Sequence, residues 1–113
     1  MTNKICHFEI GCRDRAKAAR FYSQVFDWKI EQKGDQAMLR TGDDVGGHLH
    51  SPGHEPHPYT IFYVMVEDVA AALNKAESLG GKKLMGPLPV PGGGGTFGWF
   101  ADPEGNTIGV YAE

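Results

Sequence analysis

The feature that most constrains the fold of this chain is an internal repeat at a shift of 54 residues. Under that shift, apolar residues fall on apolar residues and one aspartate falls on another. The matching pairs are Phe8 and Phe62, Ile10 and Val64, Cys12 and Val66, Asp14 and Asp68, Ala16 and Ala70, Ala18 and Ala72, Ala19 and Leu73, and Ile30 and Leu84. Two halves of similar structure are therefore expected.

Each half has the same expected order of elements. A short apolar strand, over 5–11 or 60–66, leads to an aspartate that is a good helix N-cap. An amphipathic helix follows, and the second one ends at Gly80 and Gly81. Strands are then predicted over 28–32, 37–41 and 45–50 in the first half, and over 82–88, 97–101 and 107–111 in the second.

This pattern predicts an α+β protein made of two βαβββ modules, at about residues 4–50 and 59–112, joined by a linker over 51–58. A four-stranded sheet with one helix has one uncovered face. We expect the two mixed sheets to form one curved cup, with the helices outside and the ligand site inside. A chain of 113 residues is expected to be a single domain.

Charge and hydropathy exclude several classes of partner. The formal net charge of -3 gives no electrostatic reason to expect binding to nucleic acid or to an anionic membrane. The longest apolar run, 59–66, is far shorter than a membrane span, and the N-terminus lacks a signal peptide's apolar stretch. A cytoplasmic protein is expected. Cys6 and Cys12, on one predicted strand, are expected to be free thiols.

Several short motifs, in their order and spacing, carry a resemblance to a known family. They are His7-Phe-Glu-Ile, Ala18-Ala-Arg-Phe-Tyr22, Val25-Phe-Asp-Trp28, Val66-Glu-Asp-Val69, Ala76-Glu-Ser-Leu-Gly-Gly81 and Asp102-Pro-Glu-Gly-Asn106. Over nearly its whole length the chain resembles the vicinal oxygen chelate superfamily, which includes glyoxalases, bleomycin resistance proteins and extradiol dioxygenases. Fold alone does not fix activity.

The resemblance implies a divalent metal, such as Ni, Zn, Mn or Fe, held by His, Glu or Gln side chains in the cup. Carried over position by position, the four ligand positions fall on His7, near His48, on Ile61 and on Gly109. Under the 54-residue shift, Ile61 is also the residue equivalent to His7. Isoleucine and glycine cannot ligate, so half of the family's set is missing.

Glu9 offers one way to complete the site. It lies two residues from His7 on a predicted strand, so both side chains project from the same face. His7, Glu9 and His48 could form a two-histidine, one-carboxylate metal site, in which Glu9 would also be the catalytic base. The alternative is that they hydrogen-bond within a polar cup floor. The stretch that contains His50, His54 and His57 is interpreted as solvated, with adventitious metal affinity only.

Aromatic and apolar residues of the second half are candidates for ligand binding. Tyr59, Ile61 and Tyr63 share one strand face, and Phe97 and Trp99 share another. We expect these five to line the cup. Core positions are expected to be taken by Phe8, Ile10, Phe21, Phe26 and Phe62.

Three functional hypotheses follow. The favoured one is a protein that binds a small organic molecule, with an incomplete family metal site. The second is a metal-dependent lyase, isomerase or dioxygenase that uses His7, Glu9 and His48. The third is a non-catalytic interaction module. A homodimer is expected because members of the family commonly pair.

Overall fold

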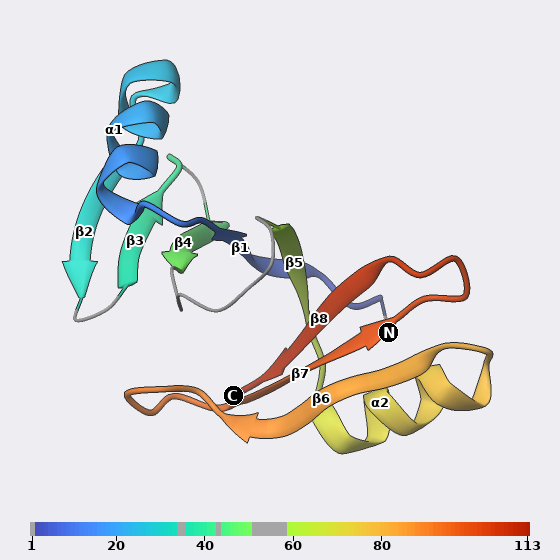
Figure 1. Ribbon diagram of the computed structural model, residues 1–113. Helices are drawn as coiled ribbons and strands as arrows, with labels where there is room; N and C mark the ends of the chain where they lie inside the picture. The colour runs from blue at the N-terminus through green and yellow to red at the C-terminus, as the bar shows by residue number, and fades with distance from the viewer. Residues whose placement is uncertain (1, 34–35, 43, 51–58) are drawn as a thin grey trace. The chain divides into compact units, whose positions relative to one another are not determined.

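The computed structural model describes the whole chain except residues 1, 34–35, 43 and 51–58 (Figure 1). The element order confirms the predicted βαβββ arrangement in both halves. The elements are β1 (Ile5–Gly11), α1 (Arg15–Phe26), β2 (Lys29–Lys33), β3 (Gln36–Arg40), β4 (Gly46–His50), β5 (Tyr59–Met65), α2 (Val69–Ser78), β6 (Lys82–Pro89), β7 (Thr96–Ala101) and β8 (Thr107–Ala112). The predicted linker lies outside the described residues.

The chain divides into two compact units, Cys6–Ile61 and a second unit of Met1–Ile5 with Phe62–Glu113. We call them the N-terminal and the C-terminal module. Both contain parallel and antiparallel strand pairs, so the sheet is mixed. Within the described ranges, neither helix is long and apolar enough to cross a membrane.

In the N-terminal module the strands follow the order β2-β3-β4-β1. The pair β1 and β4 is parallel, and the other pairs are antiparallel. Helix α1 begins as predicted, because the Asp14 carboxylate accepts a hydrogen bond from the Lys17 backbone N–H at 3.0 Å. The helix packs on one sheet face, over a core of Ala19, Ala37, Leu39 and Leu49 with Phe8 and Ile10 against it.

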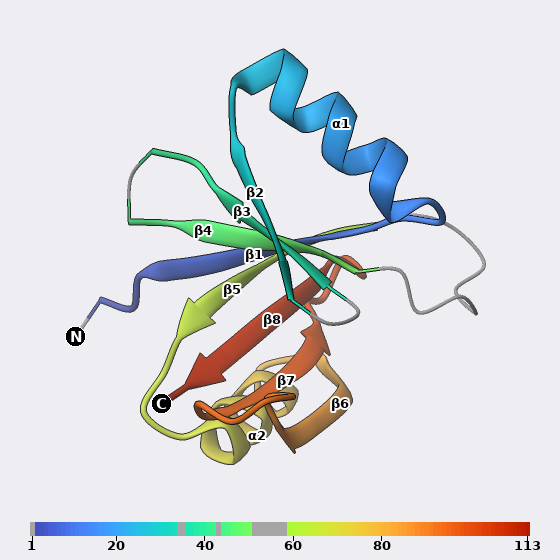
Figure 2. The same ribbon diagram turned by 90° about the vertical axis from the view of Figure 1, so that its left-hand side faces the viewer.

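The C-terminal module repeats this plan with the strand order β5-β8-β7-β6 (Figure 2). Asp68 caps α2 through the Ala71 N–H at 3.1 Å. At the other end of the helix, Gly80 has a φ of +103°, which is the left-handed conformation expected of a C-terminal glycine stop. The core beneath α2 consists of Val69, Leu73, Val110 and Ala112.

Three of the five residues predicted for the core are in fact exposed. Phe21 is 57% exposed, Phe26 is 55% exposed and Phe62 is 41% exposed, whereas Phe8 and Ile10 do pack against the core. Phe21 lies about 200° around the helix from the buried Ala19, and Phe26 is the last residue of α1. Phe62 is on β5, and α2 packs against β6, β7 and β8 instead.

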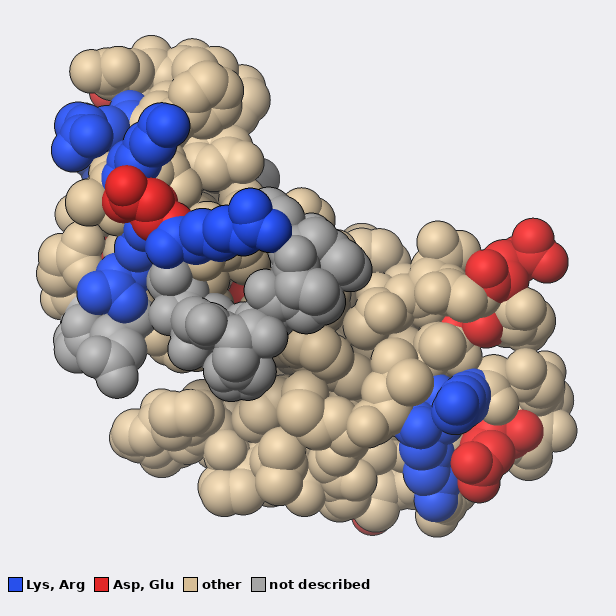
Figure 3. All heavy atoms as spheres, in the orientation of Figure 1, with Lys and Arg blue, Asp and Glu red and all other residues tan. Residues whose placement is uncertain are grey.

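The surface carries charges of both signs. In the space-filling view, acidic side chains accompany basic ones on the face shown (Figure 3). Two of the contacts are Arg40 with Glu31 at 3.7 Å and Lys83 with Glu77 at 3.9 Å. Exposed pairs of this kind contribute little to stability, and they are typical of a solvated surface.

Candidate functional site

The polar residues predicted from the first strand gather on one face of the N-terminal module. Because side chains alternate along a strand, the packing of Phe8 and Ile10 against α1 directs His7 and Glu9 to the opposite face. On β4, the buried Leu49 faces the α1 core in the same way, and His48 therefore faces away from it. The parallel register of β1 and β4 aligns Glu9 with His48. We call this the open face.

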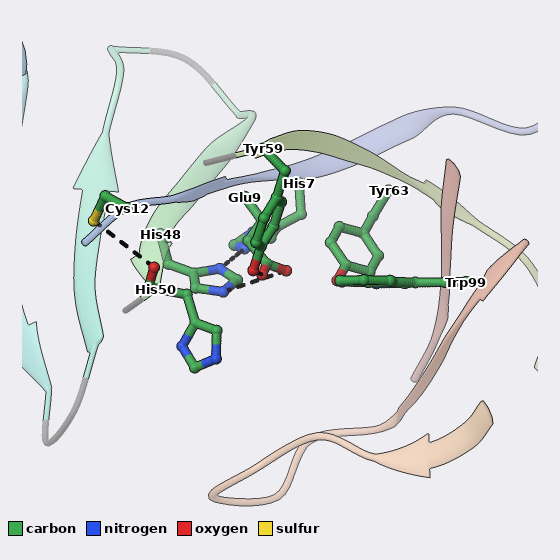
Figure 4. Close-up of polar contacts among 8 residues, drawn as sticks. All are labelled: His7, Glu9, Cys12, His48, His50, Tyr59, Tyr63 and Trp99. Carbon is green, nitrogen blue, oxygen red and sulfur yellow. Dashed lines mark hydrogen bonds and ion pairs between the residues drawn. The ribbon is translucent and has the colours of Figure 1, made fainter. Parts of the chain in front are cut away.

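On the open face, four side chains form a connected polar chain (Figure 4). His7 Nε2 lies 2.7 Å from His48 Nδ1, and the two rings are stacked with centroids 4.9 Å apart. On the other side of the His48 ring, Nε2 lies 3.6 Å from Glu9 Oε1. The Tyr59 hydroxyl donates a hydrogen bond to Glu9 Oε2. The structure therefore brings His7, Glu9 and His48 together.

Tyr59 has a role that the sequence did not reveal. The sequence predicts it as a ligand-binding residue, and the structure shows in addition that its hydroxyl donates a hydrogen bond to the carboxylate of Glu9, a residue that is only 4% exposed. Its ring lies over Gly11, where a Cβ atom would stand 2.2 Å from Tyr59 Cε2. A glycine two residues after Glu9 on the same strand face was the available signal for a large neighbouring side chain.

Burial keeps His7 and His48 neutral at pH 7. It lowers the pKa of His48 to about 4, despite the opposing effect of nearby Glu9, and it also lowers the pKa of His7. The contact between His48 and Glu9 is therefore not an ion pair at neutral pH. In the His48 tautomer that carries its proton on Nε2, this proton faces the carboxylate and Nδ1 accepts a hydrogen bond from His7 Nε2–H.

Among the described residues, the remaining histidines do not extend the row of polar contacts that joins His7, His48, Glu9 and Tyr59. The His50 ring lies edge-on to the His48 ring, with centroids 6.2 Å apart. Its buried Nδ1 atom has no hydrogen-bond partner among the described residues. His54 and His57 lie outside them.

A second candidate group, made of aromatic residues, lies in the C-terminal module. A Cβ on Gly98 would stand 3.0 Å from Leu73 and Val69 of α2, so the alternating neighbours Phe97 and Trp99 face away from that helix. Trp99 Nε1 donates a hydrogen bond to the Tyr63 hydroxyl at 2.8 Å. The Tyr63 and Phe97 rings meet edge to face, with centroids 6.4 Å apart. Three of the five predicted ligand-binding residues thus form one group.

A family model described as the Glyoxalase/Bleomycin resistance protein/Dioxygenase superfamily matches residues 4–110. The chain belongs to this superfamily. A glyoxylase-like domain-containing protein of Didymella fabae is 30% identical to it, over 92% of this chain and 89% of the relative.

Solved structures of the superfamily's fold also match. The hypothetical protein BH1468 of Bacillus halodurans has a TM-score of 0.75 at 14% identity, covering all of this chain and 96% of that one. The Mn(II)-bound glyoxalase of Novosphingobium aromaticivorans has a TM-score of 0.66 at 18% identity, covering 98% of this chain and 40% of that one. At these identities the likeness establishes the fold, and it shows that a structural relative binds a divalent metal.

The positions at which the resemblance implies metal ligands can now be compared with the side chains that stand there. Ile61 is 3% exposed and apolar. At Gly109, an added Cβ would lie 2.5 Å from the Tyr63 ring, so the space above this glycine is filled by an aromatic side chain. Neither position provides a donor atom.

The donor atoms that are present do not converge on one point. His7 and Glu9 approach opposite nitrogens of the same His48 ring, and these nitrogens point in different directions. Within the described ranges, no group of three or more His, Cys, Asp or Glu side chains is arranged to hold a metal ion. The observed arrangement of His7, Glu9 and His48 therefore does not fit a three-ligand divalent metal.

Proposed function

We propose that this protein binds a small organic molecule on its sheet, without a built-in metal. The observation that carries this proposal is the connected polar chain of the N-terminal module. His7, His48 and Glu9, the side chains best suited to ligate a metal, make hydrogen bonds or close contacts with one another and with Tyr59.

Two further observations support a ligand with substantial apolar surface. His7 and His48 are neutral at pH 7, so these two side chains add no positive charge to the open face. Partly exposed aromatic side chains face away from α2 in the C-terminal module. Small-molecule sites are typically lined by apolar and aromatic residues with a few polar groups that fix orientation. The proposed binding residues are Tyr59, Ile61, Tyr63, Phe97 and Trp99.

The test is a ligand screen with a chemically diverse library, carried out on protein treated with EDTA and then freed of it. Binding is detected by ligand-observed NMR and by thermal shift. The proposal predicts hits whose affinity is unchanged when Ni, Zn, Mn or Fe is added back. If every hit requires one of these metals, the metal-free proposal is wrong.

A metal-dependent lyase, isomerase or dioxygenase is the second candidate, because His7, Glu9 and His48 do share one face and a solved structure of similar fold contains Mn(II). In that case Glu9 would be the catalytic base, and the His48 ring would have to turn to bring the donors together. It predicts near-stoichiometric metal after dialysis with trace metals, lost in both His7→Ala and His48→Ala. Elemental analysis of untagged protein separates it from the first proposal.

Self-association remains part of the proposal, either beside ligand binding or as the function of a non-catalytic interaction module. Phe21, Val25 and Phe26 are all more than half exposed on α1. Apolar side chains gathered in this way are typical of a protein interface, and a second copy of this chain is the proposed partner. No nucleic-acid or membrane partner is proposed, and the proposed location is the cytoplasm.

A further inference from the structure

We infer that the ligand carries a carboxylate group, which lies above Gly46 on the open face and contacts the guanidinium of Arg40. This inference rests on the proposed small-molecule binding and names the charged group by which the ligand is recognised. It gives a binding role to Arg40, which belongs to none of the short motifs of the sequence.

The strand register places Gly46 between a histidine and an arginine. On one side, Gly46 of β4 is aligned with His7 of β1 in the parallel pair. On the other side, Leu39 of β3 is aligned with Gly47. Because β3 and β4 are antiparallel, the residue after Leu39, which is Arg40, comes beside Gly46. These residues form one row across the sheet.

Strand alternation directs the cations of this row to the open face. Leu39 and Ile30 contact the core on the α1 side of the sheet. Their neighbours Arg40 and Lys29, which are aligned with each other, therefore project from the opposite side. At the other end of the row, burial lowers the pKa of His7 and keeps it neutral at pH 7. The positive charge of the row thus lies at its outer end.

The space above Gly46 differs from that above Gly11, another glycine of the open face. An added Cβ at Gly11 would stand 2.2 Å from the Tyr59 ring, so an aromatic side chain already fills that place. Apart from its neighbours in the chain, the only described atom within 4 Å of a Cβ at Gly46 is the carbonyl oxygen of Leu39, at 3.4 Å. Gly46 therefore leaves room for a ligand group beside Arg40.

The guanidinium of Arg40 is suited to bind such a group. Its Nη2 atom lies 3.7 Å from Glu31 Oε1, which is longer than a hydrogen bond, and the Arg40 side chain is 70% exposed. Its planar fork of N–H donors matches the two oxygens of a carboxylate. Since the contact with Glu31 is loose and solvated, a ligand carboxylate can take its place.

The test compares acids with amides of the same shape, because the amide lacks the negative charge. The two pairs are cyclohexanecarboxylate with cyclohexanecarboxamide, and 2-naphthoate with 2-naphthamide. Affinities are measured at pH 7 by NMR titration of the isotope-labelled full chain. A charge-assisted contact at an exposed site is expected to favour the acid of each pair at least about threefold. Equal affinities would overturn the inference and leave the proposed function standing.

Three charge variants locate the contact. In Arg40→Gln the preference for the acids is expected to disappear. In Glu31→Gln, which removes the competing carboxylate, the acids are expected to bind about twofold more tightly. Arg20→Gln is the matched control, because Arg20 is an exposed arginine of α1 and its loss changes the net charge equally. A preference that survives in Arg40→Gln, or that falls as far in Arg20→Gln, would overturn the inference.

A variant at Gly46 tests the place itself. Gly46 has no positive φ, and a Cβ there meets nothing closer than 3.4 Å, so Gly46→Val is expected to fold. Its side chain would occupy the space, and the acids are expected to lose most of their affinity. Unchanged affinity of the acids for Gly46→Val would overturn the inference.

A readout on the wild-type chain keeps the test decisive if Gly46→Val does not fold. The acids are expected to shift the backbone N–H resonance of Gly46 and to leave that of Gly105, in the C-terminal module, unchanged. No shift at Gly46 would overturn the inference. If none of the four compounds binds at millimolar concentration, the carboxylate inference is wrong, while the proposed function is still decided by the library screen.

Discussion

The hydroxyl of Tyr59 donates a hydrogen bond to the buried carboxylate of Glu9, although 50 residues separate the two in the chain. This contact satisfies an acceptor that would otherwise be costly to bury. It also continues the chain that runs through His48 to His7. The polar residues of the open face therefore act as a unit, and removal of one member should affect the others.

We predict that Tyr59→Phe lowers the free energy of unfolding by about 1–3 kcal/mol, because Glu9 then loses the hydrogen bond from this hydroxyl. Urea unfolding followed by circular dichroism measures this change. Tyr22→Phe is the matched control, since the Tyr22 hydroxyl makes no hydrogen bond within the described ranges; its expected change is much smaller. Equal losses in the two variants would mean that the bond to Glu9 contributes nothing specific.

The low pKa of His48 predicts a pH dependence of stability. Its pKa is about 4 in the folded chain and about 6.5 when unfolded, so the unfolded state binds more protons between these values. Stability is expected to be highest above about pH 6.5, and to fall by up to about 3 kcal/mol as the pH drops towards 4. NMR titration of the imidazole carbons gives the pKa directly.

The control for this pH dependence is His48→Gln, which keeps a polar side chain but does not titrate. In this variant the loss of stability between pH 7 and pH 4.5 should be smaller than in the wild type. A His48 pKa measured near 6.5 would contradict the prediction, and it would remove the evidence that this ring is neutral and buried.

We predict that Gly109→Ala destabilises the chain by about 1–3 kcal/mol, because the new Cβ would overlap the Tyr63 ring. Gly46→Ala is the matched control, since a Cβ there meets nothing closer than 3.4 Å. Thermal unfolding measures both. In a Tyr63→Ala background the cost of Gly109→Ala should largely vanish, and a cost that persists there would show that the ring is not its cause.

The exposed apolar residues of α1 predict self-association. Light scattering at micromolar concentration is expected to give twice the mass of the chain. Phe21→Asp combined with Val25→Asp should shift the protein to monomer, because charged side chains would then have to be desolvated in the interface. Leu79→Asp, at another exposed apolar residue, is the control. A monomeric wild type would contradict the proposed homodimer.

The sequence by itself determined the order of the elements and most of their bounds. Strand alternation, helical periodicity and N-capping depend on residues only a few positions apart, so the roles of Asp14 and Asp68 and the stop at Gly80 could be predicted. The same local alternation placed His7 and Glu9 on one strand face. The repeat then extended each prediction from one half to the other.

The tertiary structure decided which of these side chains touch. Whether His7 bonds to His48, Tyr59 to Glu9, or Tyr63 to Trp99 depends on strand register over 36 to 50 residues of chain, which no local pattern specifies. It also decided that Phe21 and Phe62 are exposed, because helix coverage of a sheet depends on where the helix packs. Residue types set the chemistry that is available, and long-range pairing selects which atoms come within bonding distance.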